Sequence, residues 1–284
     1  MRIGLPGLGS TIDKLVQQAK DAEADGFSSL WYTGATAGDP LVAMAIAGRA
    51  TSTIELGTAI VQTYPCHPLL MATRAKAVAS AIGTPHRFTL GIGPSHQPVI
   101  EGMLGLSYAT PGTHTEEYVQ ALVPQLADAD IPVLVAALGP RLLRVAGQHT
   151  AGTIPWLANA TAIEQHVAPL IRKAAANAGR PEPRIVAGLP VAVHDDVAEA
   201  RAAAAEQFTI YGTLPNYQRI LAAGGAAGPA DAAIVGDEAS VANQIGALFE
   251  AGATEVWGAP FGVGDDKPAS RARTRALLKE LANS

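Results

Sequence analysis

An apolar segment followed by an amphipathic segment recurs eight times along the chain, and this alternation constrains the fold more than any other feature. The apolar segments read RIGLP, SSLWY, ELGTAIV, RFTLGI, PVLVAAL, GTIPWLA, RIVAGLPVAV and TEVWGAP. The stretches that follow them place apolar residues at helical spacing, as Ile12, Leu15, Val16, Ala19 and Ala22 do in the first unit. Apolar strands that alternate with amphipathic helices predict a parallel sheet covered by helices.

Eight strand and helix units in 284 residues favour a closed (β/α)8 TIM barrel, with residues 1–284 as one domain. The alternative is an open doubly wound sheet, whose first strand would lead into the phosphate fingerprint G-x-G-x-x-G. That fingerprint is absent, because GLPGLGS has glycines only at 4, 7 and 9. Residues 207–236 exceed the length of one crossover and predict extra helices and a glycine-rich loop late in the barrel.

Several helix ends are marked in the sequence. Ser10 and Asp13 resemble a capping box for the first helix, and Gly26 stands where a helix C-cap favours glycine. Asp39 with Pro40 predicts the start of the second helix, and Pro68 predicts the start of the third.

Composition restricts the kinds of molecule that the protein can bind and the cellular compartment in which we expect it. The formal net charge of −5, with no basic run, argues against nucleic acid and acidic membranes as partners. No apolar segment reaches the roughly 20 residues of a membrane span, and MRIGLPGLGS lacks a signal core, so we expect a soluble cytoplasmic protein. Cys66 is the only cysteine, which excludes a disulfide framework, and the histidines lack metal-ligand spacing, so no metal site is predicted.

Barrel enzymes place their sites at the carboxyl ends of the strands, which selects the candidate residues. The candidates in the loops after the strands are Gly7, Gly9, Thr33, Gly34, Gln62, Thr63, Tyr64, His67, Ser95, His96, Arg141, Trp156, Asn159, His194 and Asp195. Most of these are uncharged polar residues with glycine nearby, and there is no G-x-S-x-G nucleophile elbow. The set therefore predicts a ligand-binding surface more than a bond-splitting dyad or triad.

Two loops combine glycine with polar groups. In VAALGPRLLR, residues 135–144, Pro140 opens a helix whose free N–H groups would bind an anion beside Arg141, and the alternative is a simple turn into the helix. In GIGPSH, residues 91–96, Ser95 and His96 follow glycines that relieve crowding at the barrel rim. His96 and His67 are the histidines best placed for function, although single loop histidines are more often solvated or capping residues.

Four segments, in this order and spacing, carry a family resemblance: AEADGFSSLWYTG, ELGTAIVQTYPCHPLLMA, HRFTLGIGPSHQPVIEGMLG and VLVAALGPRLLRVAGQHTAGTIPW. The chain resembles the luciferase-like flavin and deazaflavin oxidoreductases, and most closely the bacterial subgroup that depends on coenzyme F420. The resemblance is clear over residues 1 to about 160 and looser beyond them.

The resemblance implies a cofactor shelf. A non-prolyl cis peptide at Ala59-Ile60 would form a bulge behind the deazaflavin or flavin ring, with Gln62 and Thr63 at the ring edge. The remaining implied cofactor residues are Gly93 and Ser95 near the ring, the backbone of Ala137, Leu138 and Gly139 at the phosphate, and Arg141 beside it. Several relatives carry an acid and a histidine after the second strand, where this chain has Thr33, Gly34 and Ala35, and others place a glutamate as proton donor where this chain has His96. The resemblance therefore leaves His96 as the proton donor, and the unperturbed histidine pKa of about 6.5 suits that role.

The resemblance also implies an activity and an assembly. We expect an F420-dependent oxidoreductase that transfers a hydride between deazaflavin C5 and a small organic substrate. The alternatives are an FMN-dependent monooxygenase on the same barrel and a non-catalytic cofactor-binding barrel. Relatives commonly dimerise, and the small residues of LVAMAIAGRAT would permit close helix packing in a homodimer, although an ordinary barrel-facing helix also explains them.

Overall fold

The computed structural model describes residues 1–33, 38–84 and 86–284, and it confirms the closed barrel. Its strands are β1 (Ile3–Gly7), β2 (Ser29–Tyr32), β3 (Glu55–Thr58), β4 (Val61–Gln62), β5 (Phe88–Gly93), β6 (Val133–Val135), β7 (Gly152–Thr153), β8 (Arg184–Val193), β9 (Ile234–Gly236) and β10 (Glu255–Pro260). All the strand pairs are parallel, and β8 closes the ring by pairing with β10 from Val186↔Glu255 to Val191↔Pro260. Because β4 continues β3 and β9 only flanks the end of β8, eight strand positions make up the ring.

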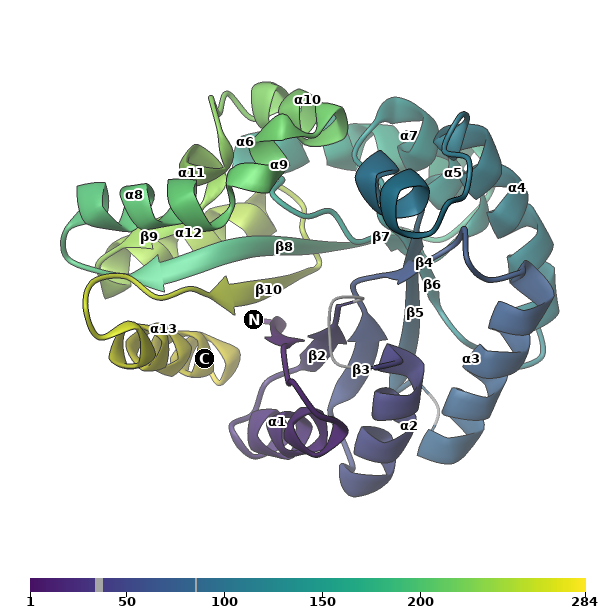
Figure 1. Cartoon of the computed structure of the whole chain (residues 1–284), viewed down its shortest axis with the longest axis horizontal. Coiled ribbons are helices and arrows are strands. Elements are labelled where there is room, and N and C mark those ends of the chain that lie inside the picture. Colours follow the sequence, from purple (N-terminus) through teal and green to yellow (C-terminus); the bar gives the residue numbers. More distant parts are fainter. Residues whose placement is uncertain (34–37, 85) are drawn as a thin grey trace.

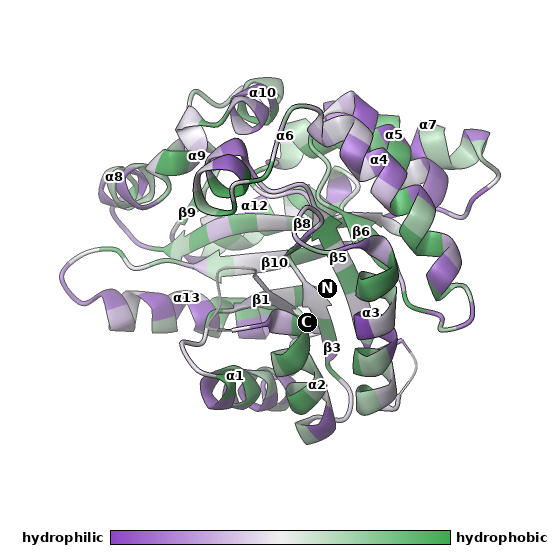
Figure 2. Ribbon diagram, turned by 45° about the vertical axis from the view of Figure 1, so that its right-hand side comes forward, coloured by the Kyte–Doolittle hydropathy of each residue, from purple (hydrophilic) through white to green (hydrophobic). Residues whose placement is uncertain are grey.

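Helices surround this ring on its outer side (Figure 1). They are α1 (Ile12–Ala24), α2 (Pro40–Ala50), α3 (Pro68–Ile82), α4 (Pro111–Leu122), α5 (Pro140–His149), α6 (Ala160–Ala162), α7 (Ala168–Asn177), α8 (Val197–Gln207), α9 (Thr209–Thr213), α10 (Pro215–Ala223), α11 (Pro229–Ala232), α12 (Glu238–Glu250) and α13 (Lys267–Ala282). Three shorter segments are a π-helix η1 (Pro98–Met103), a 3-10 helix η2 (Val123–Leu126) and a π-helix η3 (Ile163–Val167). Hydrophobic residues gather along β3 and β5 and on α2 and α3, where the helices pack on the barrel (Figure 2).

The late insertion contains the predicted extra helices and one unpredicted strand. Helices α9, α10 and α11 occupy residues 209–232, and β9 follows them and pairs with the last three residues of β8. This strand was missed because three residues, IVG, carry too little periodicity to separate a strand from a loop. The insertion therefore extends the sheet beyond the barrel as well as adding helices.

The helix starts were predicted correctly at α2 and α3 but not at α1. Asp39 caps α2 by accepting the Leu41 N–H, and α3 begins at Pro68. At α1 the N-cap is Thr11, whose hydroxyl accepts the Lys14 N–H, so the capping box expected from Ser10 and Asp13 is wrong by one residue. Gly26 does follow the helix with a φ of +82°, a conformation that glycine adopts without strain.

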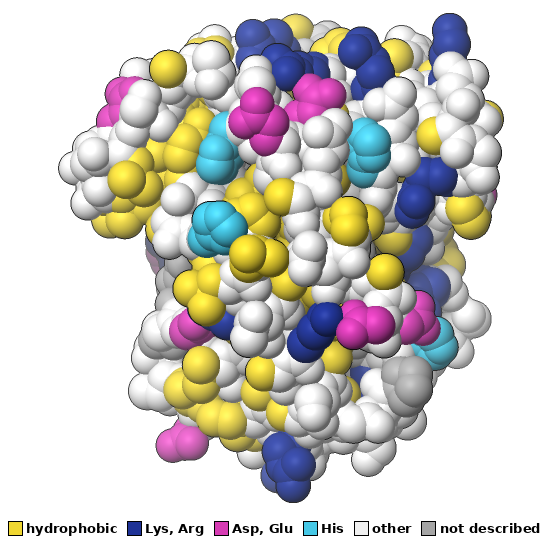
Figure 3. Space-filling model, turned by 90° about the vertical axis from the view of Figure 1, so that its right-hand side faces the viewer, with side chains coloured by type: hydrophobic (Ala, Val, Ile, Leu, Met, Phe, Trp, Pro, Cys, Tyr) yellow, Lys and Arg dark blue, Asp and Glu magenta, His cyan; other side chains and the backbone are white. Residues whose placement is uncertain are grey.

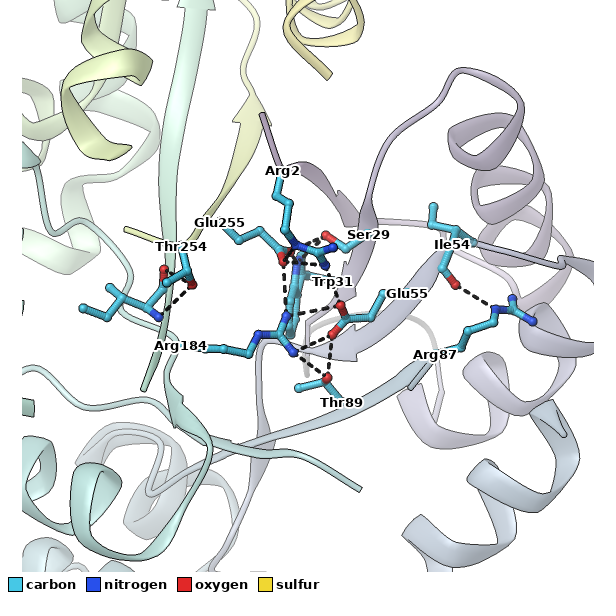
Figure 4. A network of polar contacts seen from close by, with 11 residues as sticks. Arg2, Ser29, Trp31, Ile54, Glu55, Arg87, Thr89, Arg184, Thr254 and Glu255 are labelled. Carbon is cyan, nitrogen blue, oxygen red and sulfur yellow. Dashed lines mark hydrogen bonds and ion pairs between the residues drawn. The ribbon is translucent and has the colours of Figure 1, made fainter. Parts of the chain in front are cut away.

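The amino end of the barrel is closed by a network of charged residues that begin the strands (Figure 4). Arg184 donates to Glu55 Oε1 at 2.9 Å and to Glu255 Oε2 at 3.1 Å. Arg2 joins the same two carboxylates, at 2.7 Å to Glu55 and 3.0 Å to Glu255. Three neutral groups complete the network: the Ser29 hydroxyl and the Trp31 indole donate to Glu255 Oε1, and the Thr89 hydroxyl donates to Glu55 Oε1.

Candidate functional site

The third barrel strand is interrupted at its carboxyl end by a bulge. The peptide bond Ala59-Ile60 is cis, as expected, and β4 then resumes pairing with β5 at Val61↔Ile92. The Thr58 hydroxyl fixes the bulge by donating to the Gly91 carbonyl at 2.7 Å and accepting the Gly91 N–H at 2.8 Å. Only glycine fits at position 91, because a Cβ there would lie 1.9 Å from the Thr58 carbonyl oxygen.

Apolar side chains, three alanines and one isoleucine, form the floor of the barrel mouth beside this bulge. Ala59, Ile60, Ala136 and Ala259 are partly buried and pack on the apolar interior of the barrel. A Cβ at Gly93 would lie 3.0 Å from the Ala136 Cβ and 3.3 Å from Ile60, so this glycine lets the strands come close. The resulting surface is apolar, which suits a flat ring resting on it.

Polar groups stand at one edge of this floor. Thr63 is 1% exposed, and its N–H donates to the Gly93 carbonyl at 3.0 Å. Its hydroxyl is hydrogen-bonded to His114 Nε2 at 3.0 Å, and the His114 ring stacks on Tyr64 with 3.8 Å between the centroids. Gln62 precedes them and is partly buried. On the face that carries α3 and α4, histidines lie among hydrophobic side chains in the upper half of the view (Figure 3).

The loop after β5 carries Ser95 and His96. Ser95 has a φ of +62°, and its carbonyl accepts the Tyr108 hydroxyl at 2.7 Å, which ties the loop to the segment after η1. Burial lowers the pKa of His96 below its ordinary value, so its imidazole is uncharged at neutral pH. No described residue forms a hydrogen bond with the His96 ring, which lies 5.5 Å from the Tyr217 ring.

The start of α5 lies beyond the end of β6. Gly139 is the N-cap of α5 with φ −95° and ψ 160°, it supplies no side-chain cap, and a Cβ added there would have no heavy atom within 4 Å. Ala137 is buried, whereas Leu138 is partly exposed and its carbonyl is hydrogen-bonded to His166 Nε2 at 2.8 Å. Arg141 is not a free cation, because its guanidinium binds the Glu116 carboxylate at 2.8 Å and 3.1 Å.

The late insertion contributes an aromatic wall. Trp156 stacks on Trp257 of the barrel interior at 4.9 Å and contacts Tyr211 of α9 at 6.1 Å. Tyr211 packs edge to face on Tyr217 of α10 at 4.8 Å, and Tyr217 reaches His96. Trp156 was expected at a strand end, whereas Tyr211 and Tyr217 were not among the expected site residues, because nothing in the order of residues shows that the insertion folds back over the mouth.

Other candidates from the sequence have different roles. His67 is exposed, and its Nδ1 caps α3 by accepting the Leu69 N–H at 3.3 Å. His194 pairs with Glu199 at 2.8 Å beyond the last residue of β8. Gly34 and Ala35 lie outside the described residues, and within the described ranges no group of three or more metal-ligating side chains is assembled.

The comparisons with known proteins agree with this geometry. Residues 2–255 match the family of luciferase-like monooxygenases. Over 163 residues the chain is 26% identical to the 5,10-methylenetetrahydromethanopterin reductase of Methanolobus tindarius, a match that covers 50% of this chain and 49% of the reductase.

Solved structures show the same fold at low identity. An F420-dependent secondary alcohol dehydrogenase in complex with an F420-acetone adduct superposes with a TM-score of 0.75 at 16% identity, covering 99% of this chain and 97% of that chain. The oxygenating constituent of 3,6-diketocamphane monooxygenase from Pseudomonas putida, in complex with FMN, gives a TM-score of 0.72 at 18% identity with the same coverage of 99% and 97%. Since the family match spans most of the sequence, the chain belongs to the luciferase-like monooxygenase family.

Proposed function

We propose that the protein is an F420-dependent oxidoreductase that transfers a hydride between the deazaflavin and a small organic substrate. The observation that carries the proposal is the apolar floor at the barrel mouth, built on the Ala59-Ile60 bulge and bordered by polar groups. The residues present fit a flat heteroaromatic ring with a phosphate tail, because the side chains of the floor are apolar and Gly139 at the start of α5 has open space around it. When bound, the deazaflavin would supply the position that takes or gives the hydride.

Each residue has a distinct part in this proposal. Ala59 and Ile60 support the ring, Gln62 hydrogen-bonds its polar edge, and Gly93 and Ser95 lie beside it. Thr63 is buried and bonded to Gly93 and His114, so it holds this edge in place from behind. The backbone N–H groups of Leu138 and Gly139, at the start of α5, hold the phosphate, where the helix favours a negative charge. Ala137 does not contribute the expected contact, because this residue is buried and its N–H donates to the Thr153 hydroxyl at 3.4 Å. Arg141 adds a charge that Glu116 partly neutralises.

His96 would exchange a proton with the substrate. Its pKa is lowered by burial, so at neutral pH the imidazole is ready to accept a proton more than to donate one. This state favours oxidation of an alcohol, in which the hydroxyl proton passes to the imidazole while the hydride leaves the carbon. The proposed role differs from the proton donor implied by the family resemblance, and the lowered pKa of His96 supports it.

FMN is the second candidate cofactor. The neighbour that carries FMN has the same barrel, so the floor and the start of α5 suit either ring system. An FMN-dependent monooxygenase would use reduced flavin and oxygen, and it would need no proton acceptor matched to an alcohol.

A fluorescence titration of the purified protein with F420 and with FMN, in the same buffer, tests the proposal. We expect micromolar or tighter binding of F420 and weaker binding of FMN. Preference for FMN would replace the proposal with the monooxygenase, and binding of neither cofactor would favour a non-catalytic barrel.

We also propose a homodimer formed through α2. Val42 and Ile46 lie one turn apart on this helix and are 47% and 45% exposed, which leaves an apolar stripe on its outer face. Sedimentation should show a dimer at micromolar concentration that Ile46→Glu converts to monomer. A wild-type monomer at that concentration would contradict the proposal.

A further inference from the structure

The pair formed by His96 and Tyr217 stands out among the polar groups above the barrel mouth. The two rings lie 5.5 Å apart with 50° between their planes, and they come from the loop after β5 and from α10 of the late insertion. Neither side chain makes a hydrogen bond with a described residue. Two polar rings from distant parts of the sequence therefore lie close together without forming a hydrogen bond to each other.

The Tyr217 hydroxyl differs from those of Tyr32, Tyr108 and Tyr118, and the Tyr217 side chain is more deeply buried than those of Tyr64 and Tyr211, which are only partly buried. Tyr32 donates to the Leu15 carbonyl and Tyr108 donates to the Ser95 carbonyl, so both are satisfied by the protein. The Tyr118 hydroxyl has no partner and is sealed from solvent. Tyr217 is 8% exposed, and its hydroxyl is not among the described polar atoms that are both unpartnered and sealed. A largely buried phenol thus presents a free hydroxyl to accessible space.

The surroundings of the pair are apolar and uncharged. Tyr217 packs on Tyr211, which in turn contacts Trp156, and Trp156 contacts Phe208. Burial raises the pKa of Tyr217 and lowers that of His96, so at neutral pH the phenol carries its proton and the imidazole is neutral. The phenol is then a hydrogen-bond donor and the imidazole a proton acceptor.

We propose that Tyr217 is a catalytic residue that donates a hydrogen bond to the oxygen of an uncharged secondary alcohol or its ketone, held between the aromatic wall and the cofactor beside His96. The inference rests on the proposed function and deepens it by naming the substrate class. In the oxidation, the O–H proton passes to the His96 imidazole, the hydride passes from the carbinol carbon to the oxidised deazaflavin, and a ketone and reduced deazaflavin result. The Tyr217 hydrogen bond holds the oxygen through the reaction and steadies its developing negative charge.

The wall also selects against charged substrates. Trp156, Phe208, Tyr211 and Tyr217 supply no cation that would pair with a carboxylate or phosphate on the substrate. Burying an unpaired anion against such a wall is costly, so we expect cyclohexanol to be preferred over 4-hydroxycyclohexanecarboxylate, a molecule of similar shape that carries a charge.

The experiment compares Tyr217→Phe with Tyr118→Phe as a matched control that also removes a buried phenol hydroxyl. Both variants keep the ring, and thermal melting verifies that each folds. For F420-linked oxidation of cyclohexanol we expect Tyr217→Phe to lower kcat/KM about 100-fold and Tyr118→Phe to leave it within about twofold. Calorimetric titration with cyclohexanone gives a readout independent of turnover, and there Tyr217→Phe should weaken binding about tenfold.

A second variant tests whether the pair acts as a unit. If Tyr217 and His96 hold the same oxygen, the loss in the double variant His96→Gln/Tyr217→Phe should fall short of the product of the two single losses. Unchanged kcat/KM and unchanged ketone affinity in Tyr217→Phe would overturn the proposal, as would failure of the wild-type chain to bind the ketone. F420 binding is measured in a separate titration. Failure of the Tyr217 proposal is therefore distinguishable from failure of the proposed cofactor.

Discussion

The two ends of the barrel treat polar groups in opposite ways. At the amino end, Arg2, Glu55, Arg184 and Glu255 satisfy one another, and Glu255 is fully buried. At the carboxyl end, the His96 ring and the Tyr217 hydroxyl lack hydrogen-bond partners among the described residues, and the side chains of the floor are apolar. The first arrangement holds strands together, and the second leaves hydrogen-bonding capacity for a ligand.

The difference shows that a polar group without a hydrogen-bond partner is a better indicator of a ligand site than a charged group whose hydrogen bonds are all made within the protein. A buried carboxylate with four donors, such as Glu255, has no capacity left for chemistry. An uncharged hydroxyl or imidazole without a partner keeps its capacity until a ligand arrives. Substitutions at the two ends should therefore affect different properties, stability at one and binding at the other.

The largest effect should come from Glu255→Ala. The change leaves Arg184 and the Trp31 indole without their shared acceptor, and breaking a buried pair from one side costs about 3–5 kcal/mol of the free energy of unfolding. Urea denaturation measures the loss, with Glu164→Ala, an exposed glutamate, as the control that should stay within about 0.5 kcal/mol. A loss below about 1 kcal/mol would mean that the network does not hold the barrel closed.

Gly139→Asp should weaken cofactor binding without lowering stability. A Cβ at this position meets no heavy atom within 4 Å, so thermal stability should hold, while the new charge opposes the cofactor phosphate. We expect F420 binding to weaken at least about tenfold, or about 1.4 kcal/mol. Gly228→Asp is the matched control, since Gly228 is likewise an N-cap followed by proline with open space around it. Equal affinities for the two folded variants would remove the phosphate anchor from α5.

The pH dependence of stability reports on the carboxyl end of the barrel, because burial lowers the pKa of both His96 and His114 there. Above the ordinary histidine pKa of about 6.5 these groups are neutral in both states and have no effect on stability. As the pH falls through the window down to the lowered native pKa, the unfolded chain takes up protons that the native chain refuses, so stability declines.

Urea denaturation at about pH 7.5 and 5.5 measures this decline. Replacing His96 with Gln should make this decline shallower. An unchanged pH dependence in His96→Gln would show that His96 titrates normally in the native state.

The smallest expected effect concerns Arg141. Glu116→Gln frees its guanidinium from the ion pair, which is partly exposed and so contributes little to stability. The freed charge should strengthen F420 binding by about twofold to fivefold, and added salt should reduce the gain. Weaker binding in Glu116→Gln would mean that the ion pair itself orients Arg141 toward the phosphate.

Local patterns in the sequence were sufficient to predict the barrel. Eight apolar strand segments and the proline and glycine signals at Asp39, Pro68 and Gly26 depend on near neighbours in the chain, and the structure agrees with them. The cis bond at Ala59-Ile60 was expected from the family resemblance alone, since no local pattern favours a non-prolyl cis peptide.

The rest of the site depends on contacts between distant residues. Tyr217 follows His96 by more than a hundred residues, and the order of residues does not show that α10 folds over the loop after β5. The network at the amino end left a weak signal that was overlooked: Glu55, Arg184 and Glu255 are charged residues that begin otherwise apolar strands. Charges at the starts of buried parallel strands can be stable only if they pair, which is a usable rule for reading such barrels.

The position of Glu255 in the sequence also affects when the barrel can close during synthesis of the chain. Glu255 lies in the last strand, yet its partners Arg2, Ser29 and Trp31 are among the first residues to leave the ribosome. Until β10 emerges, the early strands lack the Glu255 carboxylate that joins Arg2, Ser29 and Trp31, and β8 lacks the neighbour that closes the ring. Contacts between such remote residues form slowly, so the nascent chain must wait, open at one seam, until its synthesis is almost complete.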